Sequence, residues 1–193
     1  MASIIDTVLQ SIGPDATNTI ARQVGADDAT TRKAIEVAVP LLVSALARNA
    51  STQQGAADLA GALARDHDGS VLGDIGGLAR DYQSGPGEAI LGHILGGQSQ
   101  PIEAGISQGT GVDGGALLKI LAPIVLGALG QSQPSGGFNP SDLASVLGGD
   151  QSAAAQSNPD LFSTLNTLLD TNRSGSAIDE VTGFLGGLFQ RKT

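Results

Sequence analysis

Two long apolar runs, each interrupted by a single proline, constrain the fold of this 193-residue chain more than any other feature. The runs are AIEVAVPLLVSALA at residues 34–47 and LLKILAPIVLGALG at residues 117–130. Each is shorter than the roughly 20 residues that a membrane-spanning helix needs, and each carries a charge, at Glu36 or Lys119. We therefore expect two buried helices and no membrane span. A proline inside a helix removes one backbone hydrogen bond, so both helices are predicted to bend.

The two runs resemble each other closely enough to indicate an internal duplication. Superposing Pro40 on Pro123 aligns apolar positions along both runs, which are Ile35 with Leu118, Val37 with Ile120, Leu42 with Val125, Ala45 with Ala128 and Leu46 with Leu129. Upstream of each run lies a similar helix-like segment, DATNTIARQVGADD in the first half and QPIEAGISQGTGVDG in the second. The sequence thus predicts copies at about residues 12–50 and 95–132, arranged around two proline-kinked central helices.

The predicted fold class is all-α, because no segment shows the alternation or the richness in β-branched residues that is typical of strands. Glycine pairs follow short Leu/Ile runs in IGGL, LGGQ, LGGD and LGGL, and we interpret them as helix ends. The predicted organisation is a duplicated multihelical body at residues 1–132 with short helices between the copies. A Ser/Gly/Pro-rich linker at 133–141 and a C-terminal helical segment at 142–193 follow it.

The C-terminal segment is predicted to hold short helices near residues 142–147, 160–170 and 177–190, with the polar run GGDQSAAAQSNPD between the first two. All four phenylalanines lie in the last third of the chain, at positions 138, 162, 184 and 189. The last helix would place Val181, Leu185, Leu188 and Phe189 along one face, with Phe184 beside them. Such a face could lie on a membrane or on a partner. Its glycine pair weakens it as an isolated helix and the acidic chain is repelled by anionic lipid, so docking on the body of the same chain is favoured and docking on a neighbouring subunit is left open.

Charge and composition exclude several classes of function. The net charge of −9 and the pI near 4.4 argue against binding nucleic acid through its phosphates. The chain has no cysteine, so disulfides, thiolate metal sites and cysteine nucleophiles are impossible. Its N-terminus, MASIIDTVLQSIGPD, has neither a basic flank nor a long apolar stretch, so no secretory signal is predicted and a cytoplasmic location is expected.

Motifs of catalysis are weak in this sequence. GTGVDG at residues 109–114 matches a dinucleotide-binding pattern, but helix-like sequence precedes it where a strand is required, so we interpret Asp113 as a helix N-cap. His93 lies among apolar residues, where a core or interface histidine is expected. An enzyme with a site around His93 or around Asp66, His67 and Asp68 is the least favoured hypothesis, and no catalytic residue is assigned.

One loop resembles a degenerate calcium-binding loop of the EF-hand type. Asp170, Asn172, Ser174 and Ser176 alternate as calcium ligands do, and Gly175 occupies the position of the sharp turn. Val181 replaces the glutamate that normally closes the loop, which leaves Asp179 or Glu180 to do so. The competing interpretation, which we favour, is a capping box in which Ser176 and Asp179 begin the last helix. No cofactor is predicted beyond weak calcium.

Three stretches resemble the YidB-like family of bacterial proteins, a domain of unknown function. They are GADDATTRKAIEVAVPLLVSALARNA, GPGEAILGHILGG and GVDGGALLKILAPIVLGALG, and the resemblance covers most of residues 1–132. The tail LLDTNRSGSAIDEVTGFLGGLF is similar to that of some members, whose loop is richer in aspartate. The resemblance implies a multihelical, cytoplasmic bacterial protein and supplies no activity.

The preferred hypothesis is a non-enzymatic helical interaction protein that associates with itself. Its basis is the duplicated body, the helices rich in Gly and Ala that can approach closely, and the phenylalanine-bearing C-terminal region. A calcium-responsive module is the alternative.

Overall fold

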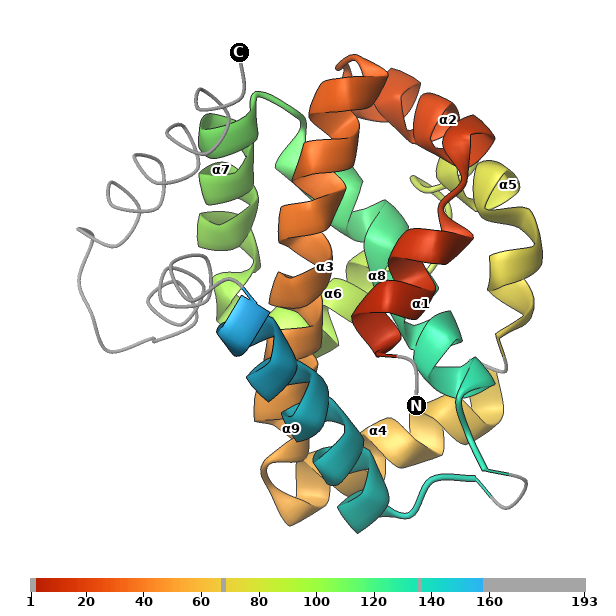
Figure 1. Cartoon of the computed structure of the whole chain (residues 1–193), viewed down its shortest axis with the longest axis vertical. Helices are drawn as coiled ribbons and strands as arrows, with labels where there is room; N and C mark the ends of the chain where they lie inside the picture. The colour runs from red at the N-terminus through yellow and green to blue at the C-terminus, as the bar shows by residue number, and fades with distance from the viewer. Residues whose placement is uncertain (1–2, 67–68, 135–136, 158–193) are drawn as a thin grey trace.

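Two buried helices, α3 (Asp28–Ala50) and α8 (Gly114–Gln131), lie against each other at the centre of the protein (Figure 1). The structure is a computed structural model that describes residues 3–66, 69–134 and 137–157. The predicted all-α, multihelical class is confirmed. Around the central pair lie α1 (Ile4–Ser11), α2 (Pro14–Val24), α4 (Gln53–Asp66), η1 (Ser70–Asp74), α5 (Ile75–Arg80), α6 (Gly87–Leu95), η2 (Gly96–Gln98), α7 (Ser99–Thr110) and α9 (Pro140–Ser157).

The central helices are buried over most of their length because their apolar residues surround the whole helix. Leu41, Leu42, Leu117 and Leu118 are each 0% exposed. In the part of the chain that the structure describes, α8 alone is long and apolar enough to cross a membrane, and 83% of its 18 residues are buried inside the protein. Length and composition of this kind also occur in core helices, so the expected absence of a membrane span stays a prediction.

Both helices continue unbroken through their prolines, Pro40 and Pro123. Pro123 cannot donate a hydrogen bond to the carbonyl of Lys119. The backbone of Gly87, the first residue of α6, packs directly against that carbonyl, and a Cβ at position 87 would overlap its oxygen. The proline in α8 thus lies opposite a site where another helix makes backbone contact.

The two predicted copies begin with nearly the same helix–turn–helix unit. Helices α2 and α7 end at Gly25 and Gly111, which have φ angles of 71° and 77°. Asp27 then accepts a hydrogen bond from the N–H of Thr30, and Asp113 accepts one from the N–H of Ala116. The prediction that Asp113 is an N-cap is confirmed, and GTGVDG joins two helices.

The two units also meet in space. Helix α2 packs on both α3 and α8, and α7 packs on both α8 and α3. The N–H of Asp113 donates to the carbonyl of Val24 over 3.0 Å, which joins the two turns directly. Pro40 lies thirteen positions after the N-cap Asp27, whereas Pro123 lies ten positions after the N-cap Asp113. No single alignment of the two halves therefore matches both the N-caps and the prolines. The three-residue difference is nearly one helical turn, and the internal duplication stays a prediction.

Helix α9 corrects two expectations about the C-terminal region. A helix was predicted at 142–147, followed by a polar run, but α9 extends from Pro140 to Ser157 through the glycine pair at 148 and 149. Leu143 and Leu147 are fully buried where α9 packs on α3 and α4, and the Asp150 carboxylate accepts a hydrogen bond of 2.7 Å from the N–H of Ile4. These tertiary contacts outweigh the low helix propensity of glycine. The pair in IGGL likewise lies within α5, whereas Gly96 of LGGQ follows the end of α6.

Candidate functional site

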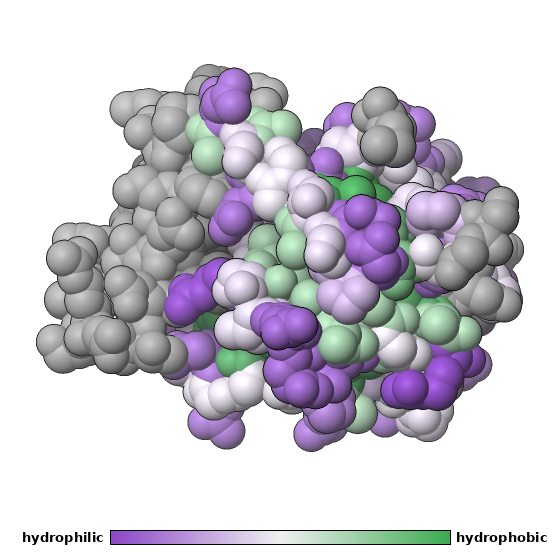
Figure 2. Space-filling model, turned by 90° about the horizontal axis from the view of Figure 1, so that it is seen from below, coloured by the Kyte–Doolittle hydropathy of each residue, from purple (hydrophilic) through white to green (hydrophobic). Residues whose placement is uncertain are grey.

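A groove of about 670 Å³ lies where the C-terminal end of α3 meets α4 and α6. Figure 2 views the protein from the end at which Figure 1 places α4, and patches of hydrophobic surface appear there between hydrophilic side chains. The lining residues are Leu46, Arg48, Asn49 and Thr52 from α3 and the turn after it, Gly55, Ala57, Asp58, Leu59, Gly61, Ala62 and Arg65 from α4, Ile90, His93 and Ile94 from α6, and Leu126 from α8.

The floor of the groove is apolar. Leu46 and Leu126 come from the two central helices, and Ile90 and Ile94 come from one face of α6. The two isoleucines are 8% and 7% exposed, and the two leucines are 1% and 4% exposed. The floor therefore consists of side chains of the hydrophobic core that expose almost no surface.

The wall formed by α4 combines small residues with charged ones. Ala57 and Ala62 present little side-chain bulk, whereas the guanidinium of Arg65 lies over Gly61, 3.2 Å from where a Cβ would be. Asp58 and Arg65 stand on the same helix, and both are exposed. The carboxylate of Asp58 accepts a hydrogen bond of 2.8 Å from the side chain of Gln54.

Asn49 fixes the distance between the two sides of the groove. Its side-chain amide donates to the carbonyls of His93 and Ile94, over 3.1 and 3.0 Å. These carbonyls lie in the last turn of α6, where no N–H within the helix is free to bond them. One side chain at the end of α3 therefore caps α6 and holds it in place. Close by, a Cβ on Gly55 would overlap the carbonyl of Asn49, so α4 also begins in direct contact with the end of α3.

His93 lies on the rim of this groove and is exposed, so of the two expected places, core or interface, the core is excluded and the interface stays a prediction. The helical period explains the difference, because α6 turns Ile90 and Ile94 inward and His93 outward. Arg48 and Arg65 line the same groove. With Asp58 they place charged groups of both signs at this groove.

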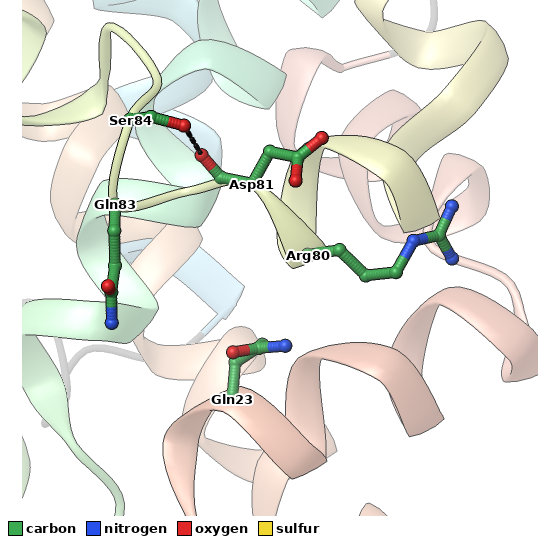
Figure 3. A pocket seen from close by; sticks show the side chains of 5 residues that line it. All are labelled: Gln23, Arg80, Asp81, Gln83 and Ser84. Atoms are coloured by element: carbon green, nitrogen blue, oxygen red, sulfur yellow. Dashed lines mark hydrogen bonds between the residues drawn. The ribbon is translucent and has the colours of Figure 1, made fainter.

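A second hollow, of about 410 Å³, is lined by Gln23, Arg80, Asp81, Gln83 and Ser84. Figure 3 shows that these five side chains point in different directions and do not meet at a common point. The hydroxyl of Ser84 donates to the backbone carbonyl of Asp81 over 3.1 Å. This hollow offers polar groups without the convergence that a catalytic site requires.

Several predicted site residues fall outside the described residues. They are the calcium-loop residues Asp170, Asn172, Ser174, Ser176, Asp179 and Glu180, the interaction residues Phe184, Leu185, Leu188 and Phe189, and also His67 and Asp68. Among the residues that the structure does describe, no three His, Asp or Glu side chains are placed to hold a metal ion.

The groove was not among the predicted sites. Its lining comes from segments about 40 residues apart, which the hydrogen bonds from Asn49 to α6 hold together. One signal was present in GAADLAGALA at residues 55–64, where alanine and glycine recur at helical spacing and produce a helix of low bulk.

A comparison with protein families identifies the body of this chain. A family model described as a bacterial protein of unknown function matches residues 6–132, which include both central helices and the whole lining of the groove. No curated protein and no solved structure matches the chain.

Proposed function

The chain belongs to the bacterial family of unknown function DUF937, which supplies no activity, and from the groove we propose that it is a non-enzymatic helical protein that associates with copies of itself. The observation that carries the proposal is the groove of about 670 Å³ between α4 and α6, where exposed Ala57 and partly exposed Leu59 and Ala62 of α4 lie over a buried apolar floor. Apolar surface rimmed by polar residues is typical of protein–protein contact sites. Small residues on α4 favour a helical partner.

Sedimentation equilibrium over a wide range of protein concentrations tests this proposal. We expect the average mass to rise with concentration, and Ala57→Glu to reduce that rise because a carboxylate in the groove would be buried by the partner. Ala64→Glu is the matched control, since Ala64 is an exposed residue of the same helix that does not line the groove. A constant monomer mass at every concentration would refute self-association.

Calcium binding by residues 170–180 is a second candidate function, supported by the alternation of oxygen-bearing side chains from Asp170 to Ser176. A ligand that binds only the folded protein raises its unfolding midpoint by mass action. If the loop binds calcium, millimolar calcium will raise the midpoint above its value in EDTA, and Asp170→Ala will abolish the rise. Identical unfolding curves in calcium and in EDTA would favour the interpretation of Ser176 and Asp179 as a capping box.

A further inference from the structure

Helix α9 is held on the body by few buried side chains. Between residues 140 and 156, only Leu143 and Leu147 are fully buried, whereas α8 is buried along almost its whole length. Ala144 and Val146 are partly buried beside them. Figure 1 shows α9 on the outside of the body, where it packs on α3 and α4. We propose that α9 is a strap that opens as a unit while the body stays folded, and that it thereby uncovers a helix-binding face.

The glycine pair inside α9 weakens this helix without a steric reason. No atom lies within 4 Å of a Cβ added at Gly148 or at Gly149. Neither residue has a positive φ angle, so neither is needed for a left-handed turn. Gly87 and Gly114 differ, because backbone oxygens of other helices occupy the space of their missing side chains. Glycine in a helix interior favours the unfolded chain, so α9 is stable as a helix only while it is docked.

The connection to the body allows α9 to leave it. Residues 132–139 join the end of α8 to the start of α9. The backbone N–H groups of Gln133 and Gly137 donate to carbonyls three residues earlier, so these hydrogen bonds do not tie the connection to α3 or α4. The match to the family model also ends at residue 132, and it includes α3 and α4. The strap is therefore attached by one end to the body that the family match delimits.

A carboxylate fastens the strap beyond its two leucines. Asp150 accepts a hydrogen bond of 2.7 Å from the N–H of Ile4, the first residue of α1. The first N–H groups of a helix have no acceptor within it, and the positive end of the helix dipole attracts a carboxylate. Leu143, Leu147 and Asp150 stand at positions i, i+4 and i+7, so one face of α9 carries these three side chains.

The docked strap shows what kind of partner this face binds. When α9 opens, its two leucines leave apolar surface of α3 and α4 uncovered. The chemistry that fits this surface is that of α9 itself: a helix with leucines at i and i+4 and a carboxylate at i+7. Closure of the strap blocks such a helix and opening admits it. This device uses no residue of residues 158–193 and is independent of the proposed self-association.

Native-state hydrogen exchange of the full chain tests whether the strap opens by itself. We expect the amides of residues 144–156 to exchange at least about tenfold faster than the slowest amides of α3 and α8, because they need only the opening of α9. Gly148→Ala with Gly149→Ala should slow the exchange of α9 about tenfold or more, since the docked helix gains propensity that the open segment does not use.

Gly92→Ala is the matched control, because it too adds a Cβ with no atom within 4 Å, but in α6 of the body. It should slow the slowest amides of α3 and α8 about twofold to fivefold and leave the exchange of α9 unchanged. If Gly92→Ala slows α9 as much as it slows the central helices, α9 opens only when the whole protein unfolds, and the strap is refuted.

A released strap tests the face beneath it. In the full chain, Leu143→Asp with Leu147→Asp should keep α9 open, because docking would bury two carboxylates without partners. We expect this chain to keep a cooperative unfolding transition and to bind a fluorescent peptide of residues 138–157 that carries Gly148→Ala and Gly149→Ala. The parent chain should bind the peptide at least about tenfold more weakly, since its own α9 competes at a high effective concentration.

The control peptide also carries Leu143→Asp and Leu147→Asp, and it should not bind. Fluorescence anisotropy measures all three combinations. Loss of the cooperative transition in the released chain would show that α9 is part of the body and refute the strap. No binding of the first peptide, or equal binding of the two peptides, would refute the helix-binding face.

Discussion

Single atoms decide how closely the helices of this protein approach. Gly87 packs against the carbonyl of Lys119, Gly114 packs against the carbonyl of Glu103, and in each case a Cβ would overlap the oxygen. Neither glycine has a positive φ angle, so conformational freedom is not the reason for its presence. What these positions require is the absence of a side chain.

Gly87→Ala should therefore destabilise the protein by about 2 kcal/mol or more, because its new methyl group meets backbone that cannot move aside. The control is Gly92→Ala in the same helix, where no atom lies within 4 Å of the added Cβ. That change should stabilise the protein by about 0.5–1 kcal/mol through helix propensity. Urea unfolding of both variants measures the difference, and equal effects would contradict the contact.

Two hydroxyls of α3, on Thr31 and Ser44, are buried without a hydrogen-bond partner. Ser44→Ala should be neutral or stabilising by up to about 1 kcal/mol, because it removes a polar group that is already unpaired. Ser107→Ala is the contrasting change, because the hydroxyl of Ser107 accepts from the N–H of Gly114 and donates to the carbonyl of Glu103. It should cost about 1–2 kcal/mol in chemical unfolding. A large loss on Ser44→Ala would show that its hydroxyl has a partner.

At the scale of the element, the stability of the first turn of α3 depends on the protonation state of Asp27. The backbone N–H and the hydroxyl of Thr30 both donate to the carboxylate of Asp27, and these bonds lower the pKa of Asp27 below its usual value. A carboxyl group whose pKa is lower in the folded state stabilises the fold above its unfolded pKa, about 3.9, and loses this effect as the pH falls through its folded pKa.

Asp27→Asn should therefore flatten the pH dependence of the unfolding midpoint below about pH 4, because an asparagine cap does not titrate. At neutral pH the two proteins should differ little. Thermal unfolding monitored by circular dichroism between about pH 2 and pH 7 checks this, across the range in which carboxyl groups titrate. Asp58→Asn is the control, and a profile for Asp27→Asn that matches the parent would contradict the role of the carboxylate.

The elements differ in how far their sequences predict them. The two central helices and the cap at Asp113 were predictable because their signals are local: an apolar run, or an aspartate after a left-handed glycine. The length of α9 was not, since its glycine pair indicates an end and the contacts that override it come from α3, α4 and Ile4. The groove was not predictable either, because it exists only once Asn49 holds α6 against the end of α3.

At the scale of the whole molecule, the net charge of −9 opposes association between copies. The self-association proposed at the groove is expected to be mainly apolar, so salt should weaken the long-range repulsion more than the contact itself. We expect self-association to strengthen as the ionic strength rises from about 20 to about 300 mM, a range over which the Debye length falls by a factor of about four. Light scattering at fixed protein concentration measures this, and association that weakens steadily with salt would indicate a contact dominated by ion pairs.

The hydrogen bond from Asp113 to Val24 joins the two helix–turn–helix units at their turns. The amide proton at position 113 is therefore shielded from solvent only while the units remain together. Its rate of exchange with deuterium reports the free energy needed to separate them. Exchange as slow as that of the central helices would show that both halves of the body unfold in one step. Faster exchange would reveal an intermediate in which each half keeps its helices but has lost the other.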